Sequence, residues 1–279
     1  MVRASNETWE KIGVYICLII LLLFVGFPFV WMFITSLKPS NEILTGGLRL
    51  IPSHFTLQHY YDVFKYGNLG TYFRNSVVVA LSTVVLSFLA VTPGAYAISQ
   101  LKLRGSAGLA RLILLFQMMP GVLLLIPLYI LLKQYNLINT HWALILSYST
   151  FTIPFCFLLS KSYFDGIPSE LFEAAFVDGC TTFGAFVRVG LPLAAPGLMV
   201  TSVYAFILAW NDFMFANTFI NSDHLRTLTT GIVTMQNSWG VQWGAMTAAA
   251  TVTTLPVLIV FLIANKYIIE GLTAGAVKG

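Results

Sequence analysis

FEAAFVDGCTTFGAFVRVGLP occupies residues 172–192 and lies between two long apolar segments of the chain. Glu173, Asp178 and Arg188 make this stretch too polar to cross a bilayer, where charged side chains are costly. Its alanines and glycines are small enough to allow close contact with another surface. Gly179 stands where a residue in the left-handed conformation would end a helix. We therefore expect a short helix outside the bilayer, with one face shaped for contact.

The composition is that of a protein that lies mostly in lipid. Of the 279 residues, 57% are hydrophobic and only 9% are charged, whereas a soluble domain carries about 25% charged residues. The net charge of +4 is small and scattered, so we expect no nucleic-acid partner. Cys17, Cys156 and Cys180 have no metal-ligand spacing, and we assign no metal to the chain.

Six apolar stretches are long enough to cross a bilayer as helices, which takes about 20 residues each. They cover about residues 12–37, 73–101, 108–132, 142–160, 189–214 and 244–266. We expect an all-α integral membrane protein with six transmembrane helices, organised as a single domain over residues 1–279. An even number of spans places both ends of the chain on the same side of the membrane.

The distribution of lysine and arginine predicts which side that is, because cytoplasmic loops carry an excess of both. With the N-terminus inside, six basic residues are outside and nine are inside. The nine are Arg3, Lys11, Lys102, Arg104, Arg111, Lys161, Arg188, Lys266 and Lys278. We therefore expect both termini, and the segment 168–192, to lie in the cytoplasm.

Three interpretations of that cytoplasmic segment follow from its residues. A hairpin lying on the bilayer surface usually carries lysine or arginine on its polar face. This helix carries Glu170, Glu173 and Asp178 instead, which disfavours that interpretation. A helix packed against the inner ends of the protein's own spans and a docking element for a partner both remain open.

A resemblance to a known family bears on this choice. Glu173-Ala174-Ala175, then Gly179 six residues after Glu173, then Val189 and Leu191-Pro192 match the EAA motif of ATP-binding-cassette (ABC) importer permeases. That motif reads E-A-A-x3-G-x9-I-x-L-P, and Val189 in place of isoleucine is the one departure. The segments that resemble the carbohydrate-uptake subfamily, and the maltose-type G subunit in particular, are SLKPSNEI (36–43), YFRNSVVVA (72–80), IPLYILLKQYNLINT (126–140), WNDF (210–213) and GLTAGAVKG (271–279).

The resemblance implies a type I ABC importer permease fold in which residues 168–192 form a coupling segment. In that family the coupling helix sits in a cleft of a cytoplasmic ATPase and transmits its movement to the spans. The tail, residues 275–279, also lies near the ATPase pair in relatives. The residues that the resemblance implies as ATPase contacts are Phe172, Glu173, Ala174, Ala175, Phe176, Asp178 and Gly179.

The same resemblance implies the partners. They are a second permease subunit forming a heterodimer, two copies of the ABC ATPase, and an extracytoplasmic solute-binding protein, in the cytoplasmic (inner) membrane of a bacterium. The chain contains no G-x-x-x-x-G-K-[ST] run to hold phosphates. We therefore expect no cofactor and no catalytic residue on this chain, with ATP and Mg on the partner ATPase subunits.

Candidate residues for the substrate path are polar groups at membrane depth. Asn211 and Asp212 lie near the outer end of the fifth span, and Gln117 lies in the third. Amides and carboxylates suit the hydroxyl groups of a sugar. Alternatively, Asp212 is solvated or paired with a neighbouring helix, Gln117 ties helices together, and sugar contacts fall mainly on the partner permease.

Other functions remain as alternatives. A permease of the same fold would serve another solute, such as glycerol phosphate or a polyamine. An ion-coupled secondary transporter would need ionisable groups inside the membrane, for which Asp212 is the one candidate. An intramembrane enzyme is disfavoured because His54, His59, His141 and His224 all fall in outer loops or at span edges.

Overall fold

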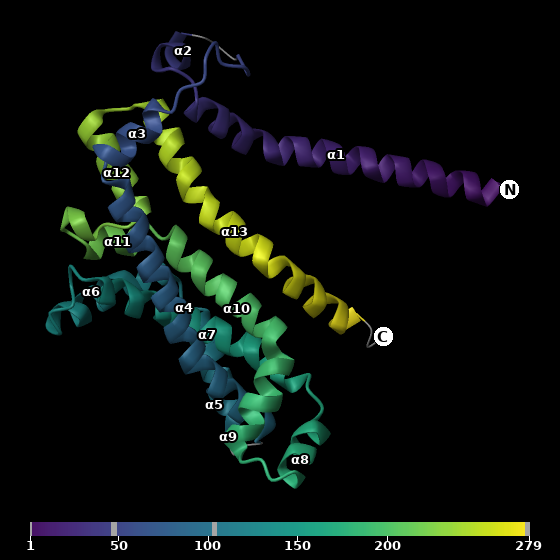
Figure 1. Ribbon diagram of the computed structural model, residues 1–279. Coiled ribbons are helices and arrows are strands. Elements are labelled where there is room, and N and C mark those ends of the chain that lie inside the picture. The colour runs from purple at the N-terminus through teal and green to yellow at the C-terminus, as the bar shows by residue number, and fades with distance from the viewer. Residues whose placement is uncertain (1, 46–48, 102–104, 277–279) are drawn as a thin grey trace. The chain divides into compact units, whose positions relative to one another are not determined.

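The structure is a computed structural model that describes residues 2–45, 49–101 and 105–276. Over these residues the chain forms helices and no strand (Figure 1). The predicted loop residues Lys102 and Arg104, and residues 277–279 of the predicted tail, including Lys278, lie outside the described residues.

The longer helices include those predicted to span the membrane, and short helices connect them. In chain order the elements are α1 (Val2–Ser36), α2 (Ser40–Thr45), α3 (Gln58–Lys65), α4 (Leu69–Gln100), α5 (Ser106–Gln117), η1 (Gly121–Leu124), α6 (Leu125–Gln134), α7 (His141–Asp165), α8 (Ser169–Val177), α9 (Thr182–Ala185), η2 (Phe186–Gly190), α10 (Leu191–Asn211), α11 (Met214–Phe219), η3 (Asp223–Leu225), α12 (Leu228–Trp239) and α13 (Trp243–Ala276).

The all-α membrane architecture predicted from the sequence is confirmed. Within the described residues, five helices are long and apolar enough to cross a bilayer, and one bent pair of helices would make a sixth span. The five continuous stretches are Lys11–Ser36, Leu69–Gln100, His141–Asp165, Thr182–Asn211 and Trp243–Tyr267. They overlap five of the six predicted ranges.

The third predicted span, 108–132, is not one continuous helix. Helix α5 ends at Gln117, and the chain turns by 92° before continuing through η1 and α6. Pro120 adopts φ −60° and ψ 125°, a conformation outside the helical region. Proline also lacks the N–H that a helix needs and disfavours helical backbone in the residue before it. The span is therefore broken at this proline.

The fifth predicted span, 189–214, ends earlier than expected. Asp212 is extended, with φ −67° and ψ 136°, so α10 stops at Asn211. The Asp212 carboxylate instead accepts a hydrogen bond of 3.0 Å from the Ala216 N–H in the first turn of α11. An aspartate that satisfies a free backbone donor at a helix start stabilises that start.

The chain divides into two compact units. The first comprises Met1–Leu69 and Thr234–Thr254, and the second comprises Gly70–Val233 and Leu255–Gly279. Helices α12 and α13 each contribute residues to both units. That residues 1–279 act as one permease domain stays a prediction.

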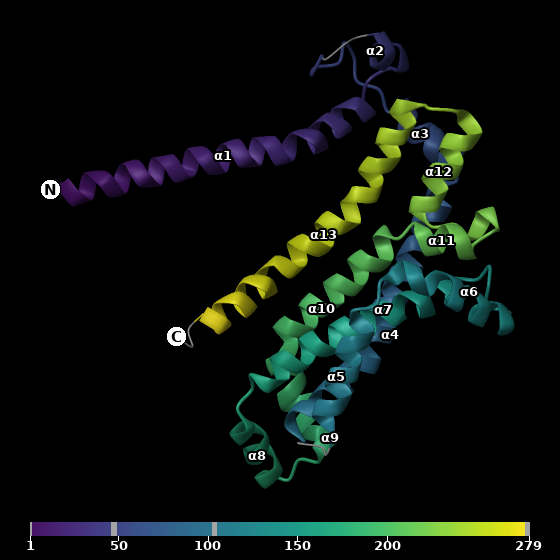
Figure 2. The same ribbon diagram turned by 180° about the vertical axis from the view of Figure 1, so that it is seen from behind.

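The second unit is built around α7. This helix packs against α10 and α5, and Figures 1 and 2 show α4 beside α7 and α10 from opposite sides. The hydroxyls of Ser87 in α4 and Thr152 in α7 lie 2.6 Å apart and form a buried hydrogen bond. Other hydroxyls in the bundle, such as those of Ser147 and Ser149, donate to the carbonyl four residues earlier. Such bonds allow polar residues to lie in apolar surroundings at little cost.

The loop that follows α11 is held in place by side chains of the same unit. The Asn75 amide donates to the carbonyls of His224 and Arg226, each at 2.9 Å. The side-chain amide oxygen of Asn139 accepts hydrogen bonds from the N–H groups of Asn221 and Ser222. These bonds give residues 221–226 a defined conformation although the segment contains only one short helical turn.

In the first unit, the chain after α1 folds back onto the end of that helix. The hydroxyls of Ser36 and Tyr60 lie 2.7 Å apart, and the His59 ring nitrogen Nε2 lies 2.8 Å from the Lys38 carbonyl oxygen. Along α1 itself, most side chains from Lys11 to Val30 are exposed. Because these exposed side chains are almost entirely apolar, this surface suits lipid or another membrane helix rather than water.

A close approach of α7 and α10 generates a stability prediction. A Cβ atom added at Gly197 would lie 2.1 Å from Cγ of Tyr163, the atom at the base of its ring. We expect Gly197→Ala to lower the stability of the folded protein by about 1–3 kcal/mol, the usual cost of overpacking a core. The measurement is the thermal midpoint of detergent-solubilised protein, followed by the loss of its monodisperse peak.

Gly26→Ala is the matched control, because nothing lies within 4 Å of a Cβ at that position in α1. Alanine there should be neutral or slightly stabilising, since it is the better helix former. Equal midpoints for the two variants would contradict the close packing of α7 on α10.

Candidate functional site

Helix α8 contains the EAA residues and ends as the sequence predicted. It runs from Ser169 to Val177 and follows Pro168. Gly179 has φ +83°, a conformation that glycine adopts without strain. The Cys180 N–H donates to the Ala175 carbonyl at 2.9 Å, which is the bond that closes a helix in a Schellman motif. The predicted stop at Gly179 is confirmed.

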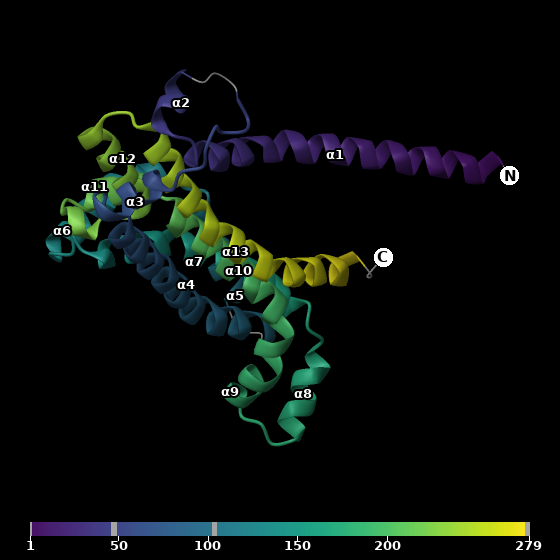
Figure 3. The ribbon, with the colours of Figure 1, turned by 45° about the horizontal axis from the view of Figure 1, so that its top comes forward.

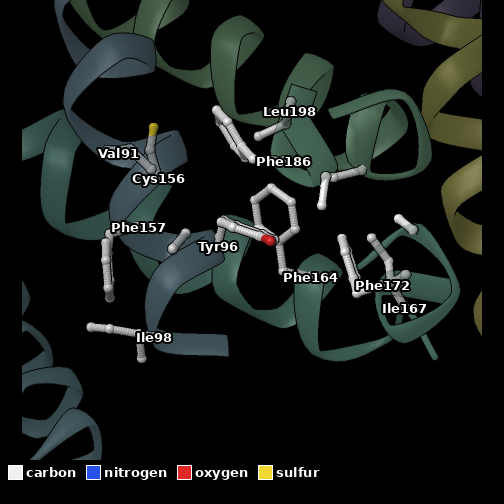
Figure 4. Close-up of a cluster of buried hydrophobic side chains, with 14 of the residues drawn as sticks. Val91, Tyr96, Ile98, Cys156, Phe157, Phe164, Ile167, Phe172, Phe186 and Leu198 are labelled. Atoms are coloured by element: carbon white, nitrogen blue, oxygen red, sulfur yellow. The ribbon is translucent and has the colours of Figure 1, made fainter. Parts of the chain in front are cut away.

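One face of α8 packs into the core of the second unit. Phe172 is 3% exposed and Ala175 is 7% exposed. Tyr96, from α4, lies at the centre of this cluster (Figure 4). Its ring centroid is 5.5 Å from that of Phe172, 5.8 Å from that of Phe164 and 5.1 Å from that of Phe186. The aromatic cluster of Tyr96, Phe164, Phe172 and Phe186 therefore joins α8 to α4, α7 and the start of η2.

This packing divides the residues predicted for coupling into a buried group and an exposed group. Phe172 and Ala175 were expected at the surface of an ATPase, but the structure places both against the chain's own core. They are three residues apart, so they lie on the same side of the helix, and that side faces inward. The predicted residues that remain exposed are Glu173, Ala174, Phe176, Asp178 and Gly179.

The outward face also contains apolar residues that the sequence analysis did not single out. Val177 is 88% exposed and Phe183, in α9, is 73% exposed. Leu171 and Val187 are exposed as well. Figure 3 shows α8 and α9 as a hairpin projecting beyond the bundle of the second unit. The sequence does contain a signal for this exposed apolar surface. Val177 lies next to Asp178 and Phe183 lies next to Thr182, in a segment predicted to lie outside the bilayer.

Two connections link this hairpin to the bundle. The Gln100 side-chain amide, at the end of α4, donates to the Phe164 carbonyl at 2.5 Å and to the Ile167 carbonyl at 3.4 Å, just before α8. On the other side, the π-helical segment η2 joins α9 directly to α10. The coupling segment, residues 168–192, is thus attached at both ends to helices of the second unit.

A cavity of about 540 Å³ lies beside the break in the third span. It brings together the three residues predicted for the substrate path, Gln117, Asn211 and Asp212. Tyr148 and Tyr204 contribute two more polar groups to its wall, and Gln117 interacts with the Tyr204 hydroxyl. Most of the remaining lining is apolar, with Phe116, Phe151 and Phe215 among it.

Asp212 is held firmly in this wall. Its carboxylate accepts a hydrogen bond of 2.8 Å from the Tyr148 hydroxyl as well as the one from the Ala216 N–H. The Thr229 hydroxyl donates to the Asp212 backbone carbonyl at 2.6 Å. The two interpretations of Asp212 are therefore compatible, because the residue is paired with a neighbouring helix and also lines the cavity.

The cavity wall contains one acidic side chain and no basic side chain. Asp212 is its one carboxylate, and no lysine, arginine or histidine is among the lining residues of this cavity. Within the part of the chain that the structure describes, no three His, Cys, Asp or Glu side chains lie close enough to hold a metal ion. Binding here would depend on hydrogen bonds and on contact with aromatic rings.

Comparison with known proteins places these features in one family. Residues 94–273 match the family of binding-protein-dependent transport system inner membrane components. The matched region includes the coupling segment 168–192 and the whole of the cavity wall.

Several relatives align along nearly the full chain. The inner membrane ABC transporter permease protein YcjP of Escherichia coli is 38% identical over 99% of both chains. The sulfoquinovosyl glycerol transport system permease protein SmoH of Agrobacterium fabrum is 37% identical, covering 91% of this chain and 89% of its own. The trehalose/maltose transport system permease protein MalG of Thermococcus litoralis is 34% identical, covering 98% of this chain and 99% of its own.

Solved structures show the same fold. A chain of a bacterial ABC transporter involved in the import of the acidic polysaccharide alginate superposes with a TM-score of 0.82 at 21% identity, covering 95% of this chain and 98% of its own. A chain of the bacterial alginate transporter in complex with its periplasmic protein superposes with a TM-score of 0.69 at 16% identity, covering 95% of each chain.

The EAA segment, the broken-span bundle and the full-length relatives agree, and the chain belongs to the family of binding-protein-dependent transport system inner membrane components, the permease subunits of ABC importers.

Proposed function

We propose that this permease imports a neutral sugar or oligosaccharide across the bacterial inner membrane, driven by ATP hydrolysis on separate subunits. The observation that carries the proposal is the cavity at the broken third span, where Gln117, Asn211 and Asp212 meet aromatic side chains. Amides and carboxylates bond hydroxyl groups, and the aromatic rings offer apolar faces for the C–H faces of a sugar.

The charge of the cavity wall supports a neutral substrate. SmoH and the alginate transporter are named for acidic substrates, and acidic groups are usually bound by arginine or lysine. The wall described here contains Asp212 and no basic side chain. The carboxylate would repel a sulfonate, a uronic acid or a glycerol phosphate, so the chemistry favours uncharged sugars such as those in the name of MalG.

In this proposal the outward face of α8 and α9 is the ATPase-coupling surface. Ala174 allows close approach, while Phe176, Val177 and Phe183 supply apolar contacts. Two copies of an ABC ATPase hold ATP and Mg, and a second permease completes a heterodimer. The N- and C-termini lie in the cytoplasm.

The proposed route of coupling follows the contacts of the second unit. A displacement of α8 acts on Tyr96 of α4 through Phe172 and on α10 through η2. Helix α10 has 21 residues and is thus about 32 Å long. It begins beside the coupling segment and ends at Asn211 in the cavity wall. One helix therefore connects the two candidate sites.

A solute-binding protein would deliver the sugar on the opposite side of the membrane. The family is named for its dependence on such a protein. The segment 221–226 and the start of α4 are the candidate contacts, because Asn75 and Asn139 hold that loop in one conformation. A loop that is already ordered loses little entropy when a partner docks on it.

The function is tested by reconstituting the chain with its partner permease, ATPase and binding protein in liposomes. We expect ATP-dependent uptake of radiolabelled trehalose or maltose and none of alginate pentasaccharide. Uptake by this chain alone, driven by an ion gradient without ATP, would overturn the proposal. Preference for the acidic sugar would overturn the assignment of a neutral substrate and leave the ATP-driven mechanism standing.

Substitutions in the cavity wall give a second prediction. Gln117→Leu and Asn211→Leu should each lower sugar uptake about tenfold, because each leaves a sugar hydroxyl without a partner. Asn217→Leu is the matched control, since Asn217 is exposed and does not line the cavity. Uptake that falls equally in all three variants would contradict the role of the cavity.

The two faces of α8 should respond differently to substitution. Val177→Asp should reduce transport and ATPase co-purification about a hundredfold, because an unpaired charge buried at an interface costs about 3 kcal/mol or more. Its thermal stability should not change, since Val177 is exposed in the permease. Phe172→Ala should instead lower the stability of the permease by about 3–5 kcal/mol.

Leu57→Asp is the control for this experiment, as Leu57 is 68% exposed and lies outside the coupling segment. It should leave ATPase co-purification unchanged. Normal recovery of the ATPase with the Val177→Asp variant would rule out α8 as the coupling surface.

A further inference from the structure

A second cavity, of about 390 Å³, lies in the first unit and is independent of the transport cavity. The end of α1, the residues before and within α2, and the start of α13 form its wall. Trp31 and Thr35 come from α1, Lys38 and Ile43 follow them, and Trp243 is the first residue of α13.

Lys38 is the charged group of this cavity. It is only 3% exposed, and its ammonium lies 4.4 Å from the centroid of the Trp31 ring. The ammonium donates one hydrogen bond, of 2.5 Å, to the Arg49 backbone carbonyl. An ammonium has three N–H donors, so this bond leaves donors for a ligand. A buried ammonium that is not neutralised is costly, and an anionic ligand would remove that cost.

The Glu42 carboxylate, whose charge interacts with that of Lys38, is engaged elsewhere. Glu42 accepts hydrogen bonds from the Ser53 N–H and hydroxyl, at 3.1 Å and 3.0 Å. The Ser53 N–H is the main cause of a lowered pKa for Glu42, with smaller contributions from Ser53 Oγ and from the charges of Lys38 and Arg49. Among the described residues, Lys38 forms no ion pair within 4.0 Å.

A second polar group of the wall has no partner in the protein. Thr35 is 7% exposed, and its hydroxyl makes no hydrogen bond among the described residues. Buried hydroxyls are nearly always bonded. Helix α13 starts at Trp243, so the positive end of its dipole also lies at this cavity. An ammonium, an unpaired hydroxyl and a helix N-terminus together suit an anion with several oxygen atoms.

The surroundings indicate where that anion comes from. Trp31 and Trp243 flank the cavity, and tryptophan is enriched where a bilayer meets water. From Trp31 the exposed apolar surface of α1 continues along Phe27 and Phe24. A wall with no amide and no carboxylate offers few acceptors for sugar hydroxyls. A ligand with an anionic head and long apolar chains matches both the cavity and the helix surface that leads away from it.

We propose that this cavity binds the headgroup of an anionic phospholipid, with the phosphodiester at Lys38 and Thr35 and the acyl chains along α1. In the topology proposed above, the lipid belongs to the outer leaflet. The site does not depend on which solute the permease carries. It gives the end of α1 a lipid that moves with the protein.

The test uses the assembled importer in detergent and native mass spectrometry with phosphatidylglycerol as the probe. Lys38→Met removes the charge and keeps the length of the side chain, and Thr35→Val removes the hydroxyl and keeps its shape. We expect Lys38→Met to weaken phosphatidylglycerol binding about tenfold and Thr35→Val to weaken it by less, as hydrogen bonds to charged groups are the stronger ones. Lys65→Met, at an exposed lysine of α3, is the control.

Three further outcomes decide the proposal. Quenching of tryptophan fluorescence by brominated phosphatidylglycerol, and its reduction in the Trp31→Phe variant, would support the position of the lipid. Equal binding by wild type, Lys38→Met and Lys65→Met would overturn the proposal, because the lipid would then be bound elsewhere. Displacement of the lipid by millimolar inorganic phosphate would also overturn it, since the ligand would then be a soluble anion.

Discussion

The contact of Tyr96 with Phe164, Phe172 and Phe186 is the interaction on which the rest of the second unit depends. These four rings come from α4, α7, α8 and η2, and Tyr96 of α4 lies far from the other three in the sequence. Aromatic pairs in such tilted arrangements add stability beyond the area they bury. Without the cluster, α8 would have little to hold it, since its other face is exposed. The same contacts therefore fix the position of the hairpin relative to α4 and α7.

The elements that depend on local chemistry were predictable from the sequence. Apolar length identified five spans, and Gly179 identified the end of α8. The break at Pro120 was not distinguishable from the prolines that stay inside helices, such as Pro154 and Pro196. All remove one N–H, and only the surrounding packing decides whether the helix bends or breaks. The inward orientation of Phe172 was equally hidden, because its partner Tyr96 is 76 residues away in the chain.

Three residues of the cavity wall could be predicted from the sequence, but their contacts could not. Gln117, Asn211 and Asp212 are predicted from the sequence as polar groups at membrane depth, and the structure brings all three to one cavity. The sequence could not indicate that the Tyr148 hydroxyl bonds the Asp212 carboxylate, because that pairing depends on how α7 packs against α10. A carboxylate held in this way keeps one orientation, so the cavity wall presents a fixed acceptor rather than a mobile side chain.

The π-helical segment η2, Phe186–Gly190, has a geometric effect at a distance. A π-turn contains one residue more than an α-turn, and one residue corresponds to a rotation of about 100° around a helix axis. Everything after η2 on α10 is therefore turned by that amount relative to an uninterrupted helix. Asn211, which lines the cavity at the end of α10, is among the residues turned in this way. A change of winding in η2 would turn a different stripe of α10 toward the cavity.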